Sequence, residues 1–264
     1  MQLDTDKIIA TTGNGVGWLT FNQPEKRNAM SLEMWQATAQ VLDAFSADPE
    51  VRVVVMQGAG DKAFVSGADI SQFEKSRSNA DAAEEYARIS GGARQKLYDL
   101  EKPLIAMIRG YCLGGGLAVA MGADFRIAAE GAQFGVPAAR MGIVYGYDGI
   151  KALVNLVGPG RAKQILYTAR RYSAEEALQM GLVEEVVPPH KLEEVVRGYA
   201  ETIAGNAPLS IWGSKQIIRQ VTGRDSELDF EEIDRLTRVA FDSADYREGR
   251  TAFMEKRQPR FTGK

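Results

Sequence analysis

Two turns rich in glycine and alanine are the features of this sequence most suited to chemistry. One ends in the triplet Gly114-Gly115-Gly116, and the other covers Ala63–Ile70. Residues this small let a carbonyl group approach the main chain, and N–H groups at the start of a helix are unpaired and favour negative charge. Two such turns can aim two N–H groups at one oxygen and form an oxyanion hole for an enolate or a tetrahedral intermediate. A glycine triplet taken alone is more typical of a tight junction between a strand and a helix.

The elements around these turns must bring them together. Each turn follows an apolar stretch that we expect to be a strand, and strands alternate with helices along most of the chain, which favours an α/β fold with crossover connections. After residue 187 the pattern is wholly helical, and Asn206-Ala207-Pro208 is the strongest boundary signal. The expected strands are 16–21, 51–56, 104–108 and 182–187, and the expected helices are 32–45, a short helix capped by Ser173 and ending at Gly181, 209–221 and 230–256.

Both turns, and four further segments, resemble the crotonase (enoyl-CoA hydratase/isomerase) superfamily at matching places in the chain. These segments are Asn22–Ala29, Ala132–Pro137, Ala174–Val183 and Glu248–Arg257. The resemblance therefore extends over nearly the whole sequence. It implies an α/β fold with a crotonase-like ββα spiral core at 1–206 and a C-terminal helical trimerisation region at 207–264, assembled as a homotrimer or a dimer of trimers.

The resemblance also implies the positions of a site for an acyl-CoA thioester. The thioester oxygen would lie between the backbone N–H groups of Ala68 and Gly115. Residues implied to line the path of CoA are Lys26, Arg27, Ala29, Ser66, Asp69, Ile70 and Gly116, while Phe253 and Lys256 would meet CoA phosphates, often from a neighbouring subunit. For the lysines and the arginine, an exposed surface position is an equally good interpretation.

Two departures from the family bear on the reaction. A typical enoyl-CoA hydratase carries one glutamate two residues after the glycine triplet and another after the Gly-x-Pro turn, since adding water to a double bond needs paired carboxylates for proton transfer. Here these positions are Ala118 and Ala138. Neither side chain can move a proton, whereas the enolate-stabilising half of the site is intact.

The segment 142–149 supplies polar side chains where ordinary hydratases have a Pro-Gly-rich turn. Tyr145 falls where methylmalonyl-CoA decarboxylases of this superfamily place a tyrosine and dihydroxynaphthoyl-CoA synthases an aspartate. Its phenol could bind a substrate carboxylate or β-carbonyl or return a proton to the enolate, or it could be a turn tyrosine with its ring on the core and its hydroxyl in water. Asp148 could orient water or Tyr145, or simply cap a helix at 149–156. Arg140 could pair with an acidic acyl group, although exposure to solvent is the favoured interpretation.

Three hypotheses follow from these residues. The first is an enzyme that decarboxylates a malonyl-type thioester or cleaves a β-ketoacyl-CoA by a retro-Claisen reaction. The second is a hydratase or double-bond isomerase whose acid and base groups have moved to Tyr145 and Asp148. The third is a noncatalytic protein that binds acyl-CoA, alone or as part of a larger complex.

Other chemistries find little support in the sequence. The chain has one cysteine, Cys112, and one histidine, His190, about eighty residues apart, so Ser/His/Asp and Cys/His triads are disfavoured and Cys112 is better interpreted as a buried structural thiol. Gly110–Gly116 is not a dinucleotide-binding motif, a P-loop is absent, and the acidic residues lack metal-ligand spacing. We therefore expect no metal and no cofactor beyond the CoA carried by the substrate.

Composition agrees with a globular enzyme. The chain has 264 residues, is 45% hydrophobic and carries a net charge of −3, which provides no general electrostatic attraction for nucleic acid or for an anionic membrane. Its N-terminus lacks the features of a signal peptide, and no apolar stretch approaches the length of a transmembrane helix. We expect a cytoplasmic protein whose partners are acyl-CoA and further copies of itself.

Overall fold

The structure is a computed structural model, and it describes residues 3–69, 80–141, 144–223 and 229–264. A six-stranded sheet has the order β1-β2-β3-β5-β7-β10, in which only β1 and β2 pair in antiparallel fashion. Its strands are β1 (Ile8–Gly13), β2 (Val16–Phe21), β3 (Val53–Gly58), β5 (Leu104–Ile108), β7 (Phe125–Ala129) and β10 (Glu185–Val187). The alternation of strands and helices thus gives the mainly parallel α/β arrangement that the sequence predicts.

A second, four-stranded sheet has the order β4-β6-β8-β9. Its strands are β4 (Ala63–Val65), β6 (Tyr111–Leu113), β8 (Gln133–Gly135) and β9 (Tyr172–Ser173). Three times in succession, a strand of the large sheet is followed within a few residues by a strand of the small one and then by a helix. This repeat confirms the ββα spiral core expected from the resemblance.

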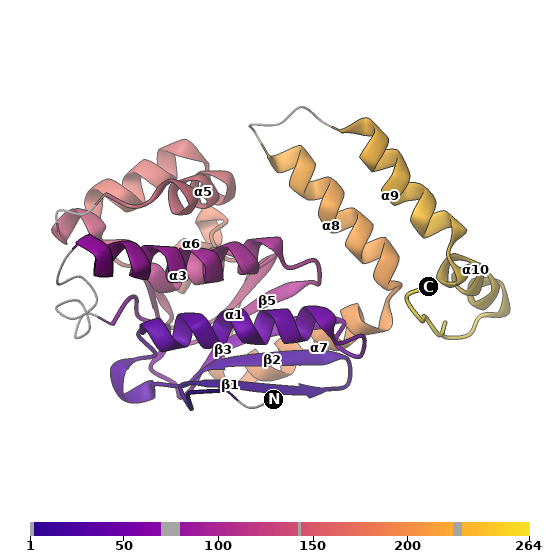
Figure 1. Ribbon diagram of the computed structural model, residues 1–264, viewed down its shortest axis with the longest axis horizontal. Helices are drawn as coiled ribbons and strands as arrows, with labels where there is room; N and C mark the ends of the chain where they lie inside the picture. The colour runs from indigo at the N-terminus through magenta and orange to yellow at the C-terminus, as the bar shows by residue number, and fades with distance from the viewer. Residues whose placement is uncertain (1–2, 70–79, 142–143, 224–228) are drawn as a thin grey trace.

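Helices cover both faces of the large sheet (Figure 1). The helices are α1 (Leu32–Ala47), α3 (Ala80–Asp99), α4 (Gly115–Met121), α5 (Tyr147–Thr168), α6 (Ala174–Met180), α7 (Leu192–Gly205), α8 (Pro208–Thr222), α9 (Phe230–Asp242) and α10 (Ala244–Glu255), with 3-10 turns η1 (Pro24–Lys26), η3 (Pro137–Met141) and η4 (Pro189–Lys191). Alternate residues of β3 point to opposite sides: Val54 and Met56 join a core with α1, and Val53 and Val55 join one with α7. Burial on both faces explains the unbroken β-branched run of this strand.

Most expected elements lie where the sequence places them. Strands 16–21 and 104–108 have the expected bounds, and the helix capped by Ser173 has both hydrogen bonds of a capping box and ends at Gly181 in the left-handed conformation. The strand expected at 51–56 occupies 53–58, and that expected at 182–187 shortens to 185–187.

The single helix expected at 230–256 is wrong, because α9 and α10 are separate helices that meet at Ser243. The Ser243 hydroxyl accepts a hydrogen bond from the Tyr246 N–H at 3.0 Å. Hydroxyl groups favour such N-terminal caps over helix interiors, so Ser243 starts a new helix although the apolar periodicity continues.

Two basic side chains of helix α8 hold it against the core. The Lys215 ammonium donates to the Lys102 carbonyl and to Asp124 Oδ2, each at 2.8 Å, and Arg219 donates to the carbonyls of Tyr98 and Leu100. Beyond α8, helices α9 and α10 extend away from the sheets, at the end of the molecule opposite α5 (Figure 1). In the described part of the chain, no helix is long and apolar enough to span a membrane.

Candidate active site

The two glycine- and alanine-rich turns lie side by side. A Cβ atom added at Gly115 would be 3.6 Å from the backbone nitrogen of Ala68, and one added at Gly67 would be 4.0 Å from the backbone nitrogen of Gly115. This proximity arises because β4 and β6, which lead into the two turns, are parallel neighbours in the small sheet. The structure thus brings together the two amides that the sequence predicts to form an oxyanion hole.

Among the described residues, neither predicted amide donates an internal hydrogen bond. Three backbone hydrogen bonds join the loop after η1 to the turn at 66–69. Ser66 N–H donates to the Arg27 carbonyl, Met30 N–H to the Gly67 carbonyl and Asp69 N–H to the Met30 carbonyl. Ala68 N–H lies between these bonds, and Gly115 N–H begins α4, where a helix offers no acceptor. Within the described part of the chain, both N–H groups are without a partner and available to a ligand.

Each glycine of the triplet has its own structural requirement. Gly114 has φ 53° and ψ −115°, a conformation that residues with side chains rarely adopt. A Cβ at Gly116 would lie 1.9 Å from the Val65 carbonyl oxygen. Gly115 has neither restriction, so the space beside its amide is open to a ligand. Gly116 therefore packs the two turns together, and the CoA-binding role that the resemblance implies for it stays a prediction.

Tyr145 lies beside the triplet. Its hydroxyl donates a hydrogen bond to the Gly114 carbonyl at 3.1 Å, and its ring packs on the main core and over Gly149. Burial raises the pKa of this phenol far above its ordinary value, so the hydroxyl keeps its proton. The ring thus packs on the core, as one interpretation of the sequence expects, but the hydroxyl is hydrogen-bonded to the main chain and not left in water.

Ala118 and Ala138 are both buried, in α4 and η3 respectively, and both belong to the main core. Ala118 is four residues beyond Gly114 and donates the N–H that closes the first turn of α4. Methyl groups thus occupy the positions at which the resemblance expects carboxylates. Arg140 is exposed, as the sequence favours.

Asp148 does not cap the helix that follows it, as one interpretation of the sequence expects. Helix α5 begins one residue earlier, at Tyr147, with Gly146 as its N-cap, so the exposed Asp148 lies in the first helical turn. There it lines a cavity together with Tyr98, Lys151 and Arg219. Its negative charge is favourable at this end of α5.

The residues expected along the CoA path form one cluster beside Ala68. Lys26 Nζ is 2.8 Å from Asp69 Oδ2, Ala29 is buried, and Ser66 is half-buried. The exposed Arg27 stacks its guanidinium 5.2 Å from the centre of the Tyr111 ring, and Arg171 lies 5.1 Å from the same centre. Ile70 lies outside the described residues. Sequence reasoning missed Tyr111 and Arg171, because no local pattern links positions that are brought together by strand pairing.

Phe253 and Lys256 lie on α10 and just after it, at the end of the molecule away from α5 (Figure 1). Lys256 is exposed, and the placement of the Phe253 side chain is outside what the structure describes. In a single chain these residues are therefore separate from the two amides.

Cys112 and His190 take no part in the site. The Cys112 side chain is fully buried, and burial strongly raises the pKa of its thiol, as expected for a structural cysteine. His190 lies in η4, before α7. Among the described residues, no group of acidic, cysteine or histidine side chains is able to hold a metal.

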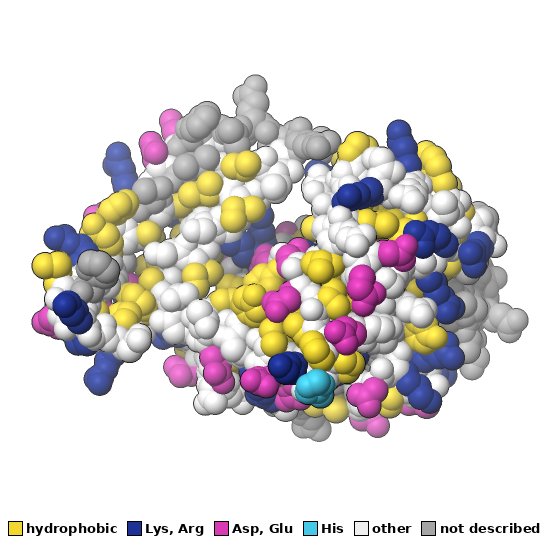
Figure 2. Space-filling model, turned by 180° about the vertical axis from the view of Figure 1, so that it is seen from behind, with side chains coloured by type: hydrophobic (Ala, Val, Ile, Leu, Met, Phe, Trp, Pro, Cys, Tyr) yellow, Lys and Arg dark blue, Asp and Glu magenta, His cyan; other side chains and the backbone are white. Residues whose placement is uncertain are grey.

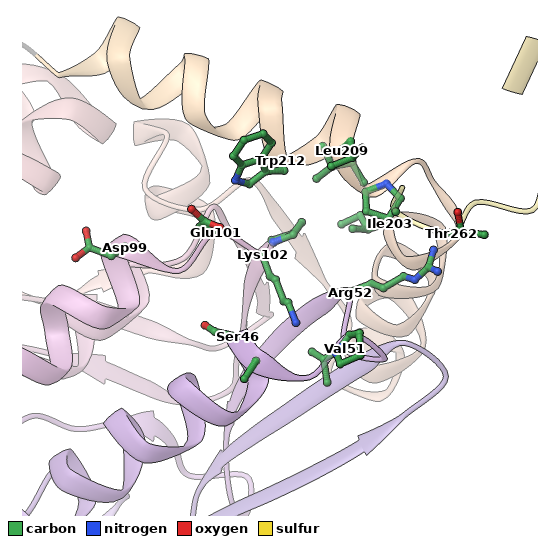
Figure 3. A pocket seen from close by; sticks show the side chains of 16 residues that line it. Ser46, Val51, Arg52, Asp99, Glu101, Lys102, Ile203, Leu209, Trp212 and Thr262 are labelled. Atoms are coloured by element: carbon green, nitrogen blue, oxygen red, sulfur yellow. The ribbon is translucent and has the colours of Figure 1, made fainter. Parts of the chain in front are cut away.

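A cavity of about 680 Å³ lies elsewhere, between the end of α1, the α3–β5 connection and the start of α8 (Figure 3). Arg52, Lys102 and Trp212 line it, but none of the residues predicted for the site does. The Lys102 ammonium is engaged there by the carbonyls of Phe45 and Asp48. This cavity thus separates the C-terminal helices from the core and does not contain the two amides.

Comparison with known proteins agrees with this geometry. Residues 11–264 match the family model described as Enoyl-CoA hydratase/isomerase. The chain is 35% identical over 256 residues to the short-chain-enoyl-CoA hydratase of Clostridium acetobutylicum, covering 97% of each, and 38% identical over 266 residues to the crotonyl-CoA hydratase of Syntrophomonas wolfei, covering 98% of this chain and 99% of the relative.

Solved structures give the same result. A crystal structure of an enoyl-CoA hydratase/carnithine racemase from Magnetospirillum magneticum is similar with a TM-score of 0.94 and 34% identity, covering 99% of this chain and 97% of that one. The agreement includes the sheets, the spiral and the C-terminal helices. This chain therefore belongs to the enoyl-CoA hydratase/isomerase family, within the crotonase superfamily.

Proposed function

We propose that this protein cleaves a carbon–carbon bond next to an acyl-CoA thioester, by decarboxylating a malonyl-type substrate through an enolate. The observation that carries the proposal is the pair of neighbouring N–H groups of Ala68 and Gly115, which have no acceptor among the described residues, combined with alanine at both positions where hydratases carry glutamate. The pair can stabilise negative charge on the thioester oxygen. No proton-transfer group is present at 118 or 138.

Decarboxylation suits these residues because the departing group is already a carboxylate. The bond between the α carbon and this carboxylate breaks, its electron pair forms the enolate held by the two amides, and CO₂ leaves. Water then supplies the proton that returns to the α carbon. Retro-Claisen cleavage also forms an enolate, but it first requires activated water to add to the β-carbonyl. Neither route needs a cofactor beyond the CoA of the substrate.

Hydration or double-bond isomerisation is the second candidate, favoured by the hydratases among the relatives. General acid–base groups contribute about 10²–10⁴-fold to such reactions, and here they would have to be Tyr145 and Asp148. The Tyr145 hydroxyl already donates a hydrogen bond to the Gly114 carbonyl, and Asp148 is exposed in the first turn of α5. These positions weaken this candidate.

A panel of malonyl-, β-ketoacyl- and enoyl-CoA thioesters, each followed by mass spectrometry in D₂O, distinguishes the candidates. We expect loss of malonyl-type thioester with release of CO₂ and one deuterium on the α carbon. Rapid hydration of crotonyl-CoA with no loss of malonyl-type thioesters would instead establish a hydratase. Tight acyl-CoA binding without turnover of any thioester would establish a binding protein.

Gly115→Val is the matching variant. Its backbone conformation accepts a side chain, whose Cβ would fill the space beside Ala68 N–H. Loss of one oxyanion-hole donor typically costs about 10²–10³ in kcat, so we expect turnover to fall at least this far while the fold is kept. Gly198→Ala, in α7 with open space around it, is the control and should retain full activity.

We also propose that the chain forms a homotrimer, or a dimer of trimers, through residues 207–264. Apolar side chains are exposed along these helices: Ile218, Val221, Phe241 and Met254. Seen from behind, hydrophobic side chains line the hollow between the C-terminal helices and the core (Figure 2). A neighbouring copy that covers such surfaces would bring its own α10, with Phe253 and Lys256, toward the CoA path.

A further inference from the structure

One peptide group connects Tyr145 to the oxyanion hole. The carbonyl of Gly114 and the N–H of Gly115 belong to the same peptide unit, so the group that accepts the Tyr145 hydrogen bond at one end presents the hole donor at the other. We propose that Tyr145 is a positioning residue, which holds this peptide plane and strengthens Gly115 N–H as a donor to the thioester oxygen. This inference rests on the proposed function of the two amides and adds a residue that controls them.

The peptide unit needs such support because its backbone is unusual. Gly114 has a positive φ, and a glycine there can turn its carbonyl more freely than any other residue. Three hydrogen bonds hold Gly114 in place. Its N–H donates to the Gly135 carbonyl at 2.8 Å, and its carbonyl accepts from Ala118 N–H at 3.1 Å and from the Tyr145 hydroxyl at 3.1 Å. The first bond ties the turn to β8, and the second belongs to α4 itself. The Tyr145 hydroxyl adds the third hydrogen bond, from the side of α5.

The hydrogen bond from Tyr145 also polarises the Gly114–Gly115 peptide group, which favours the same outcome as positioning it. A hydrogen bond to a carbonyl draws electrons toward its oxygen and makes the N–H of the same peptide a better donor, so that hydrogen bonds in a chain strengthen one another. When negative charge develops on the thioester oxygen, this chain would run from that oxygen through Gly115 N–H and the Gly114 carbonyl to the Tyr145 hydroxyl. The effect is therefore larger in the enolate than in the ground state, which raises kcat more than it changes KM.

The setting of the ring restricts the hydroxyl to this role. A Cβ at Gly149 would be 2.6 Å from Tyr145 Cε1, so glycine at this position allows the ring to lie against the backbone of α5. Burial raises the pKa of the phenol most, Tyr98 and Cys112 raise it further and Arg94 lowers it, so the phenol is protonated at neutral pH. The hydroxyl therefore acts on the hole through its hydrogen bond to the Gly114 carbonyl.

Tyr145→Phe tests the inference, because it removes the hydroxyl and keeps the packed ring. The probe is acetyl-CoA labelled with ¹³C at its thioester carbonyl, bound to the full chain, with the carbonyl stretch read by infrared difference spectroscopy. We expect the wild-type protein to lower this frequency and the variant to lose part of the shift, with the dissociation constant within about twofold. With the productive substrate, kcat should fall about three- to tenfold at unchanged KM, the effect of one lost hydrogen bond.

Two further variants keep the test decisive. Gly149→Ala displaces the ring while keeping the hydroxyl and should reproduce the losses of Tyr145→Phe, whereas Tyr167→Phe, an exposed tyrosine at the far end of α5, should match the wild-type protein. An equal carbonyl shift and equal kcat in wild type and Tyr145→Phe would overturn the inference but leave the hole intact. A changed pH profile of kcat would overturn it in favour of proton transfer. No carbonyl shift in the wild-type protein would overturn the hole and the inference together.

Discussion

The three consecutive glycines at 114–116 meet three different needs, which only the structure separates. Gly114 supplies a backbone conformation, Gly115 leaves open space beside the Ala68 N–H, and Gly116 allows α4 to approach β4. The sequence identifies the triplet as a possible hole, because small residues after a strand have few other uses. It does not show which glycine serves which need, since their neighbours are distant in the sequence: Pro137 for Gly114, Ala68 for Gly115 and Val65 for Gly116.

Gly116→Ala should destabilise the fold instead of blocking the site. The added Cβ would be 1.9 Å from the Val65 carbonyl oxygen, and backbone atoms at both sides would have to move. We expect a loss of about 2 kcal/mol or more in the free energy of unfolding, measured with urea, as for other overpacked positions. Gly198→Ala should instead be neutral or stabilising by up to about 1 kcal/mol. Equal stability of Gly116→Ala and the wild-type protein would show that the two turns separate easily.

Much of the candidate site follows from single residues, and the remainder depends on long-range contacts. The two amides, and the alanines at 118 and 138 where the resemblance expects glutamates, can be identified because each lies within a recognisable local pattern. The partner of the Tyr145 hydroxyl is not readable, since it lies 31 residues away in the chain and is reached only when α5 packs beside α4. The same reason hides the contact of Arg171 with Tyr111.

At the scale of elements, periodicity predicts strands and helices well where one local preference dominates. It fails at Ser243, where a side-chain cap interrupts an apolar pattern that continues on both sides. It also starts β10 three residues too early, because Leu182 N–H donates to the Ala177 carbonyl at the end of α6. Both errors arise where hydrogen bonds at a helix end compete with the pattern.

The C-terminal segment is held against α10 by acidic side chains, and this contact should depend on pH. Glu248 accepts hydrogen bonds from the Arg257 guanidinium and from Arg260 N–H, which lower the pKa of its carboxyl to about 2. A carboxyl whose pKa is lowered in the folded state stabilises that state above its ordinary pKa of 4.5, and the contribution disappears as the pH falls toward 2.

Hydrogen exchange of residues 257–263 measures this contact. In the wild-type protein, we expect protection to be constant above about pH 5 and to decrease progressively below it. Glu248→Gln should show lower protection at neutral pH and little further change on acidification. Protection that falls equally in both proteins would show that Glu248 is not the source of the pH dependence.

At the scale of the whole molecule, the position of α10 connects assembly to substrate binding. The two amides belong to the spiral core, whereas Phe253 and Lys256 lie at the opposite end of the same chain (Figure 1). If a CoA molecule contacts both sets of residues, they must come from different copies. Loss of assembly should then weaken binding of acyl-CoA even though the oxyanion hole is unchanged.

Met254→Glu tests this connection, because it places a charge on a side chain of α10 that is 79% exposed. By sedimentation, we expect the wild-type protein at three or six times the chain mass of 28.9 kDa and the variant shifted toward single chains. Binding of acetyl-CoA, measured by calorimetry, should weaken together with assembly. Ile9→Glu, on β1 outside the C-terminal helices, should change neither quantity. A wild-type protein that sediments as a single chain, or a dissociated variant that keeps its affinity, would mean that one chain contains the complete binding site.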